Sequence, residues 1–177
     1  RTALQYISTK TVQQEERYIL GELSRETLGM TLRLDYAITP ELTLQYYGNP
    51  YVSVGTFNNI KRITEPRASD YENLYHVFDT EEIGYEAESN QYRIDEDGNG
   101  EADYWIDNPD FNFREFRSNL VARWEFKPGS ALYVVWTHGR SVYENALTHS
   151  LQNGISNLFE SEPDNVYLIK FNYWFSI

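Results

Sequence analysis

The chain has 177 residues, a net charge of −12 and no cysteine. The length fits one domain or part of a larger one, and the lack of cysteine excludes disulfides, thiolate zinc sites and thiol nucleophiles. The excess of acidic residues argues against nucleic-acid binding, because phosphate contacts need clustered Lys and Arg. The 15 Tyr, 9 Phe and 4 Trp favour β-strands and suit membrane–water interfaces.

An unbroken alternation predicts the first clear strand. Apolar side chains occupy every second position from Leu28 to Ile38, with polar or small residues between them. Because successive side chains of a strand point to opposite faces, this strand has one apolar and one polar face. A Thr-Pro-Glu turn at 39–41 then reverses the chain, and a second strand begins at Leu42.

A long connection follows, roughly from Phe57 to Asp110, and it carries most of the negative charge. Between Glu65 and Asp110 there are 15 acidic and 2 basic residues, a charge of −13, so the remaining 12 acidic and 13 basic residues give +1. We expect this connection to be a solvated surface loop on a protein whose other charges nearly cancel. Cation binding by the loop is the alternative.

Within this connection, residues 95–103 resemble the calcium loop of EF-hand and dockerin-type repeats. Alternate residues of such a loop aim oxygen atoms at one Ca²⁺ ion. The predicted ligands are Asp95, Asp97, Asn99, Glu101 (through its backbone carbonyl) and Asp103. Gly100 matches the glycine of the sharp turn, but Ile106 replaces the usual bidentate Glu at the twelfth position, where neighbouring Asp107 is a possible substitute. An acidic Gly/Asn turn without an ion is the alternative.

A second hairpin and a terminal strand complete the pattern. Apolar residues alternate from Phe116 to Phe126, a Lys-Pro-Gly-Ser turn at 127–130 follows, and the alternation resumes from Leu132 to Trp136. After a second long connection, roughly 144–164, the final residues 166–177 read VYLIKFNYWFSI, in which one face is wholly apolar and aromatic and the other carries Lys170, Asn172 and Ser176, with Trp174 among them.

The order of turns and connections favours an antiparallel up-and-down transmembrane β-barrel. Barrels of the outer membrane place short turns on the periplasmic side and long loops outside, and a periplasmic C-terminus puts both short turns inside here. We therefore expect 57–110 and 144–164 to be extracellular loops. About six strands are visible whereas the smallest barrels need about eight, so we expect the remaining strands upstream of Arg1.

The polar face of these strands is predicted to line the lumen. It carries charges of both signs: Arg33, Asp35, Arg117, Arg123, Glu125 and Lys170. Facing lipid, an Arg or Lys at the midplane would cost roughly 2–4 kcal/mol, whereas in the lumen these residues can pair across strands. A structural charge ladder and a selectivity filter are both open interpretations, and we favour the ladder.

Three segments resemble a Bacteroidota family known as domain of unknown function 5916. They are LTLQYYGNPYVSVGTFNNIKRITEPRASDY (42–71), NPDFNFREFRSNLVARWEFKPGSALYVVWTHGRS (108–141) and NVYLIKFNYWF (165–175). The resemblance implies an N-terminal carbohydrate-binding module of family-nine type followed by an outer-membrane barrel. It provides no established functional residues.

We therefore expect the C-terminal portion of a Gram-negative outer-membrane barrel that serves transport or anchors a surface glycan-related module or complex. Its partners would be membrane lipid, the upstream barrel strands and a surface glycan or outer-membrane protein complex. No Ser, His or carboxylate constellation predicts an enzyme. The alternative is a soluble, calcium-stapled β-sandwich that binds glycans.

Overall fold

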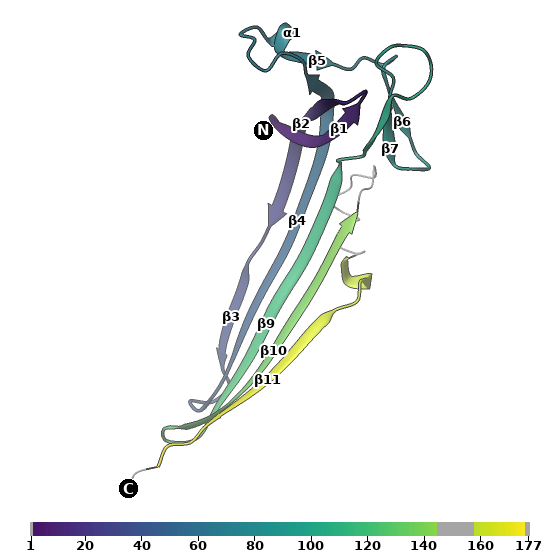
Figure 1. Ribbon diagram of the computed structural model, residues 1–177. Helices are drawn as coiled ribbons and strands as arrows, with labels where there is room; N and C mark the ends of the chain where they lie inside the picture. The colour runs from purple at the N-terminus through teal and green to yellow at the C-terminus, as the bar shows by residue number, and fades with distance from the viewer. Residues whose placement is uncertain (1, 145–157, 176–177) are drawn as a thin grey trace. The chain divides into compact units, whose positions relative to one another are not determined.

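The structure, a computed structural model, describes residues 2–144 and 158–175. Almost all of the regular structure is antiparallel β (Figure 1). The elements are β1 Thr2–Val12, β2 Glu15–Gly29, β3 Leu32–Ala37, β4 Leu42–Ile63, α1 Tyr71–Leu74, β5 Tyr75–Val77, β6 Ile83–Glu86, β7 Gln91–Ile94, β8 Tyr104–Asp107, β9 Phe111–Lys127, β10 Ser130–Glu144 and β11 Asp164–Asn172. The prediction of an all-β, antiparallel chain is confirmed.

The larger sheet has the strand order β1-β2-β4-β9-β10-β11, and β3 and β5 also pair with β4. A smaller sheet has the order β6-β7-β8. The chain divides into two compact units. The described part of the first unit covers residues 2–26 and 54–111, and that of the second covers 27–53, 112–144 and 158–175. Each unit is described on its own below.

The second unit contains the two predicted hairpins and the final strand. The turn after Ala37 joins β3 to β4, with Leu34 opposite Tyr46 and Tyr36 opposite Leu44. Strands β9, β10 and β11 run side by side in antiparallel register (Figure 1). The Oγ1 atom of Thr39 accepts hydrogen bonds from the backbone amides of Glu41 and Leu42, which fixes the first of the two turns.

The first predicted strand is interrupted at residues 30 and 31, between β2 and β3. Pro50 lies opposite the break and has no backbone N–H to donate, so a regular ladder cannot continue there. Its carbonyl accepts the amide of Met30 at 3.1 Å, and the side-chain amide of Asn49 donates to the Met30 carbonyl and to Thr31 Oγ1. The apolar alternation nevertheless continues through the break with Leu28, Met30 and Leu32. All three side chains are exposed.

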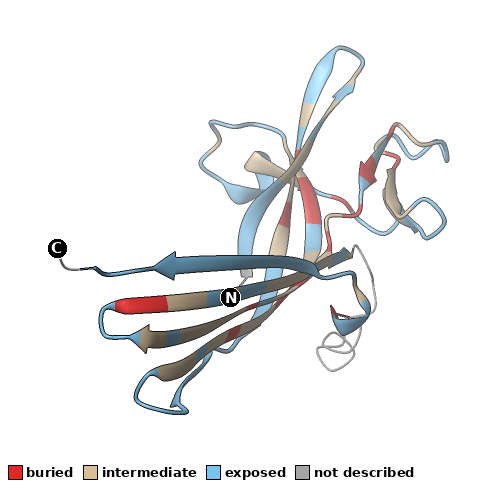
Figure 2. Cartoon of the chain, turned by 90° about the horizontal axis from the view of Figure 1, so that it is seen from below, coloured by how far each residue is buried: buried red, intermediate tan, exposed pale blue. Residues whose placement is uncertain are grey.

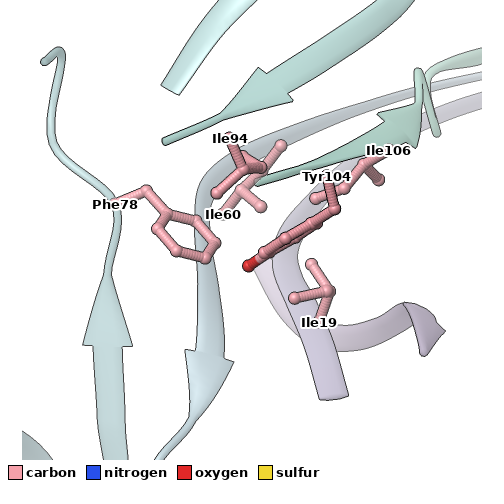
Figure 3. Packing of buried hydrophobic residues seen from close by; sticks show 6 residues of the cluster. All are labelled: Ile19, Ile60, Phe78, Ile94, Tyr104 and Ile106. Atoms are coloured by element: carbon pink, nitrogen blue, oxygen red, sulfur yellow. The ribbon is translucent and has the colours of Figure 1, made fainter. Parts of the chain in front are cut away.

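The first unit holds a compact hydrophobic core. Its buried members are Ile19, Ile60, Phe78, Ile94, Tyr104 and Ile106 (Figure 3). Most of them come from the connection that we predicted as a long loop. This connection carries α1 and the short strands β5–β8. Its two ends are joined where the amide of Phe57 donates to Asp110 Oδ1 at 2.7 Å.

The short strands β5–β8 have only three or four residues each, too few to show an alternation in the sequence. The other expected connection, 144–164, lies largely outside the described residues, as do Ser176 and Ile177 at the end of the predicted final strand.

Candidate functional site

Strands β9, β10 and β11 build three apolar rows on one face of the second unit. Side chains directly opposite each other in an antiparallel sheet lie on the same face, so the register defines the rows. They are Leu120–Trp136–Tyr167, Ala122–Val134–Ile169 and Trp124–Leu132–Phe171. The hairpin of β3 and β4 adds exposed apolar residues, among them Leu34 and Tyr36.

This apolar face is open, and no second layer of described residues in the unit covers it. Tyr36 is 67% exposed, Trp124 50%, Ile169 73% and Phe171 61%. Strand β11 is exposed along its whole length (Figure 2). Single exposed apolar residues are ordinary on soluble proteins, whereas contiguous exposed apolar faces are typical of sites that contact proteins, membranes or ligands.

Aromatic rings with polar atoms mark both ends of the apolar face. At one end Trp136 Nε1 donates to Asn165 Oδ1 at 2.9 Å, and His138 Nδ1 lies 3.0 Å from the same oxygen. At the other end Lys127 Nζ lies 5.2 Å from the ring centre of Tyr173. Tyr and Trp favour positions where one end of the ring is dry and the other wet.

Between these ends the rings stack along β11. The ring centres of Phe126 and Phe171 are 5.5 Å apart at an interplanar angle of 10°, those of Trp136 and Tyr167 are 6.4 Å apart at 5°, and Tyr173 continues the series from Phe171 at 6.4 Å. These two stacks lie on the same face of β11, with Ile169 between Tyr167 and Phe171.

The opposite face of the same strands carries the predicted charges in paired form. Arg123, Tyr133 and Lys170 form one row across β9, β10 and β11. Arg123 Nε donates to Tyr133 Oη at 3.3 Å, and Lys170 Nζ lies 5.5 Å from the Tyr133 ring centre. Arg123 also pairs with Glu125 at 2.5 Å. Three of the six predicted ladder residues thus meet around Tyr133. Arg123 and Lys170 contact it directly, and Glu125 is linked to it through Arg123. Tyr133 itself was not predicted.

The other ladder residues share this face but not this cluster. Arg33 lies 5.5 Å from the Tyr47 ring centre, and Arg33 and Asp35 line a hollow together with Asn119. Arg117 pairs with Glu115 at 2.7 Å rather than with another predicted residue. The face therefore carries all six predicted charges, with contacts between and along strands, and one apolar row, Val121–Val135–Leu168, lies beside the Tyr133 cluster.

The acidic loop in the first unit joins β7 to β8. Its side chains accept backbone hydrogen bonds from within the loop: Asp95 Oδ2 from Gly100, Asp97 Oδ1 from Asn99, and Asn99 Oδ1 from Glu101. Gly98 and Gly100 have φ angles of +69° and +90°, the left-handed region that glycine adopts without strain. One carboxylate oxygen from each of Asp95, Asp97 and Asp103 lies within 4.8 Å of the others.

The remaining predicted positions of the loop differ in role. Ile106 is fully buried in the hydrophobic core, so the twelfth position supplies no ligand. Asp107 Oδ1 accepts a hydrogen bond from Gln91 at 2.7 Å. Glu96, the second residue of the loop, lies 3.0 Å from Arg62 Nε.

Glu96 also links the loop to the core. The Tyr104 hydroxyl donates to Glu96 Oε1 at 2.6 Å. Burial, and then this hydrogen bond, raise the pKa of Tyr104 well above its ordinary value, so that the phenol stays neutral. The carboxylate of Glu96 thus holds the start of the loop against the first unit.

The family described as domain of unknown function (DUF5916) matches residues 2–177. The chain belongs to the DUF5916 family. No curated protein and no solved structure gives a significant match. Among the described residues, no helix is both long enough and apolar enough to cross a membrane.

Sequence reasoning missed one charged cluster of this DUF5916 chain. Lys61 is 1% exposed, and its Nζ donates to Glu22 Oε1 at 2.7 Å and to the Tyr71 hydroxyl at 2.6 Å. It also lies 5.3 Å and 5.8 Å from the ring centres of Tyr71 and Tyr75. Lys61 falls in the segment predicted as a loop, and no sequence pattern links it to Glu22.

The two histidines of the DUF5916 chain that the structure describes each lie beside a hydrogen-bonding side chain. His76 Nε2 lies 2.7 Å from Glu82, and His138 contacts Asn165 at the end of the apolar face. His149 lies outside the described residues. Both described histidines thus have local hydrogen-bonding partners.

Proposed function

We propose that this chain forms part of the wall of a Gram-negative outer-membrane β-barrel. The observation that carries the proposal is the second unit's sheet, whose apolar face is open and whose opposite face is charged. A barrel wall needs this division, because one side contacts hydrocarbon and the other contacts the lumen. The proposed partner of the apolar face is membrane lipid.

The height of the apolar face fits the membrane. From Tyr167 to Phe175 the chain advances eight residues, five steps within β11 and three beyond its end at Asn172; fully extended, this segment spans about 26 Å at ~3.3 Å per residue. A strand tilted by about 40° covers roughly 20 Å of this along the membrane normal, close to the apolar band of about 25 Å in such barrels. The polar row of His138 and Asn165 lies directly beyond Tyr167, where an interface is expected.

Charge placement supports the same division. Arg123 and Lys170 lie on the face opposite Trp124 and Ile169. An Arg or Lys facing lipid at the midplane costs roughly 2–4 kcal/mol, and none stands among the three apolar rows. In the proposed lumen these cations have Tyr133 and Glu125 as partners, so we interpret the cluster as structural support of the wall.

The proposal requires more strands than the second unit supplies. Its strands β3, β4, β9, β10 and β11 are fewer than the roughly eight that close the smallest barrels. Unpaired backbone groups at an open edge are too costly in lipid, so further strands complete the wall. We place them upstream of Arg1 in the same protein.

The proposed orientation follows the lengths of the connections. The short turns at 39–41 and 127–130 and the C-terminus lie in the periplasm, and the acidic connection 57–110 is extracellular. In this arrangement the barrel serves transport, or it anchors a surface glycan-related module of the family-nine carbohydrate-binding type in a bacterium of the Bacteroidota. Catalysis has no part in the proposed role.

The alternative is a soluble β-sandwich that binds glycans. A sandwich buries one face of each sheet against a second layer. The exposure of Tyr36, Ile169 and Phe171 in the second unit favours lipid over this alternative, because no described residue of the unit packs as a second layer there.

Fractionation of cells that express the full-length protein tests the proposal. We expect the protein to stay in the outer-membrane pellet through high-salt and alkaline carbonate washes and to be released only by detergent, because the apolar face holds it in the bilayer. A soluble periplasmic protein from the same cells is the control for incomplete lysis. Recovery in the salt-washed soluble fraction would favour the sandwich.

A further inference from the structure

We propose that the acidic loop between β7 and β8 binds one Ca²⁺ ion through the carboxylates of Asp95, Asp97 and Asp103. The site belongs to the first unit and does not depend on the membrane role proposed above. Hard cations such as Ca²⁺ bind oxygen ligands, and carboxylates are their strongest protein ligands.

One buried, unpartnered oxygen atom points to a ligand. Asp95 is only 3% exposed, and its Oδ1 atom has no hydrogen-bond partner among the described residues. Buried carboxylate oxygens are costly to leave without a partner, because burial removes the water that would otherwise solvate them. A bound cation removes this cost.

The negative charge of the cluster also favours a bound cation. The three carboxylates lie within 4.8 Å of one another, and none of them forms an ion pair with a Lys, Arg or His of the described residues. The nearby Arg93 instead donates to the Gly100 carbonyl at 2.9 Å. Like charges at this separation repel each other, and a divalent cation between them reverses the sign of the interaction.

The loop already holds these carboxylates in place. Asp95 and Asp103 each use one oxygen, Oδ2, to accept a backbone amide, from Gly100 and Glu96 respectively. In both residues Oδ1 remains available for an ion. Preorganised ligands lower the cost of ordering the site when the ion binds.

Ion binding would hold the β7–β8 hairpin together at the loop that joins its two strands. Ile94 precedes the loop and Tyr104 follows it, and both are buried in the core of the first unit (Figure 3). An ion that fixes the loop therefore also fixes the two strands that contribute these core residues. A ligand that binds only the folded state raises the thermal stability.

The affinity is expected to be modest. Because Ile106 stands where EF-hands carry a bidentate Glu, two strong oxygen ligands are missing. Sites of this strength have dissociation constants on the order of 10⁻⁴–10⁻³ M, the range of extracellular modules.

Terbium luminescence of the full-length protein in detergent tests the site directly. Tb³⁺ occupies calcium sites and emits when nearby Trp or Tyr rings are excited, and Tyr104 and Trp105 directly follow Asp103. We expect sensitised emission that Ca²⁺ displaces at submillimolar to millimolar concentration, together with a rise of Tm in Ca²⁺. Asp95→Asn and Asp103→Asn should each weaken binding at least tenfold.

Glu86→Gln is the matched control, because it removes the same charge from the exposed end of strand β6 outside the cluster and should leave binding unchanged. Circular dichroism confirms that each variant is folded. Equal emission and Ca²⁺ displacement in unmodified protein and in Asp95→Asn would overturn the proposal. So would the absence of Ca²⁺-displaceable emission, or equal displacement by Mg²⁺.

Discussion

At the residue scale, the buried Lys61 shows how the first unit accommodates a charge. A buried lysine is tolerated only when it is paired and hydrogen-bonded. Burial alone lowers the pKa of Lys61, but the hydrogen bonds from its Nζ to Glu22 and to the Tyr71 hydroxyl outweigh this, so that the pKa is raised overall. Hydrogen bonds from Lys61 and then from Asn59 lower the pKa of Glu22.

These shifts predict the pH dependence of stability. The lowered pKa of Glu22 contributes stability above its unfolded value of about 4.3, and this contribution is lost as the pH falls through the lower, folded pKa. The raised pKa of Lys61 contributes below about 10.4 and is lost only as the pH rises through the higher, folded pKa. The pair therefore stabilises the fold fully near neutral pH.

We expect Glu22→Gln to lower the denaturant midpoint at pH 7 and to have a smaller effect at pH 3, because the contribution of the lowered Glu22 pKa declines once the pH falls below the unfolded value of about 4.3. Chemical denaturation at both pH values measures this. Glu88→Gln, in an exposed turn of the same unit, should change neither midpoint. A loss for Glu22→Gln that is as large at pH 3 as at pH 7 would contradict the assignment.

At the element scale, the long strands with a strict alternation were predictable and the short ones were not. From Phe116 to Trp136 the alternation and the Pro-Gly turn define both strands and their faces. The break at Met30 depends on Pro50, which the sequence places in another strand, so only the pairing of β2 and β3 with β4 reveals it. The same holds for Tyr133, whose role in the charged row depends on the register.

Neighbouring positions on β11 provide a test of the two faces. Ile169→Arg places a cation among the apolar rows and, with lipid there, should destabilise the protein by roughly 2–4 kcal/mol. Leu168→Arg places the same side chain on the charged face, and we expect a small effect. Urea unfolding of the full-length protein in lipid vesicles measures both. Similar costs at the two positions would argue against lipid contact on one face only.

At the scale of the whole molecule, the two units differ in whether their apolar residues are buried or exposed. The first unit buries Ile19, Ile60 and Ile106 in a closed core, as in a water-soluble domain. The second unit leaves Ile169 and Phe171 exposed and pairs its charges on the other face. The sequence predicted the division of faces, because alternation is local. The core of the first unit was not predictable, because it joins residues that are far apart in the chain.

The central claim is that the exposed face of the second unit contacts hydrocarbon, and spin labels on β11 test it most directly. Since residues 1–177 include no cysteine, introduced cysteines at positions 167–171 can each carry a nitroxide in the full-length protein in liposomes, once any cysteine elsewhere in that protein is replaced. We predict that labels replacing Tyr167, Ile169 and Phe171 collide mainly with dissolved oxygen, and those replacing Leu168 and Lys170 mainly with a water-soluble nickel chelate. Labels at 167, 169 and 171 that are shielded from both reagents, or that are as accessible to nickel as their neighbours, would contradict it.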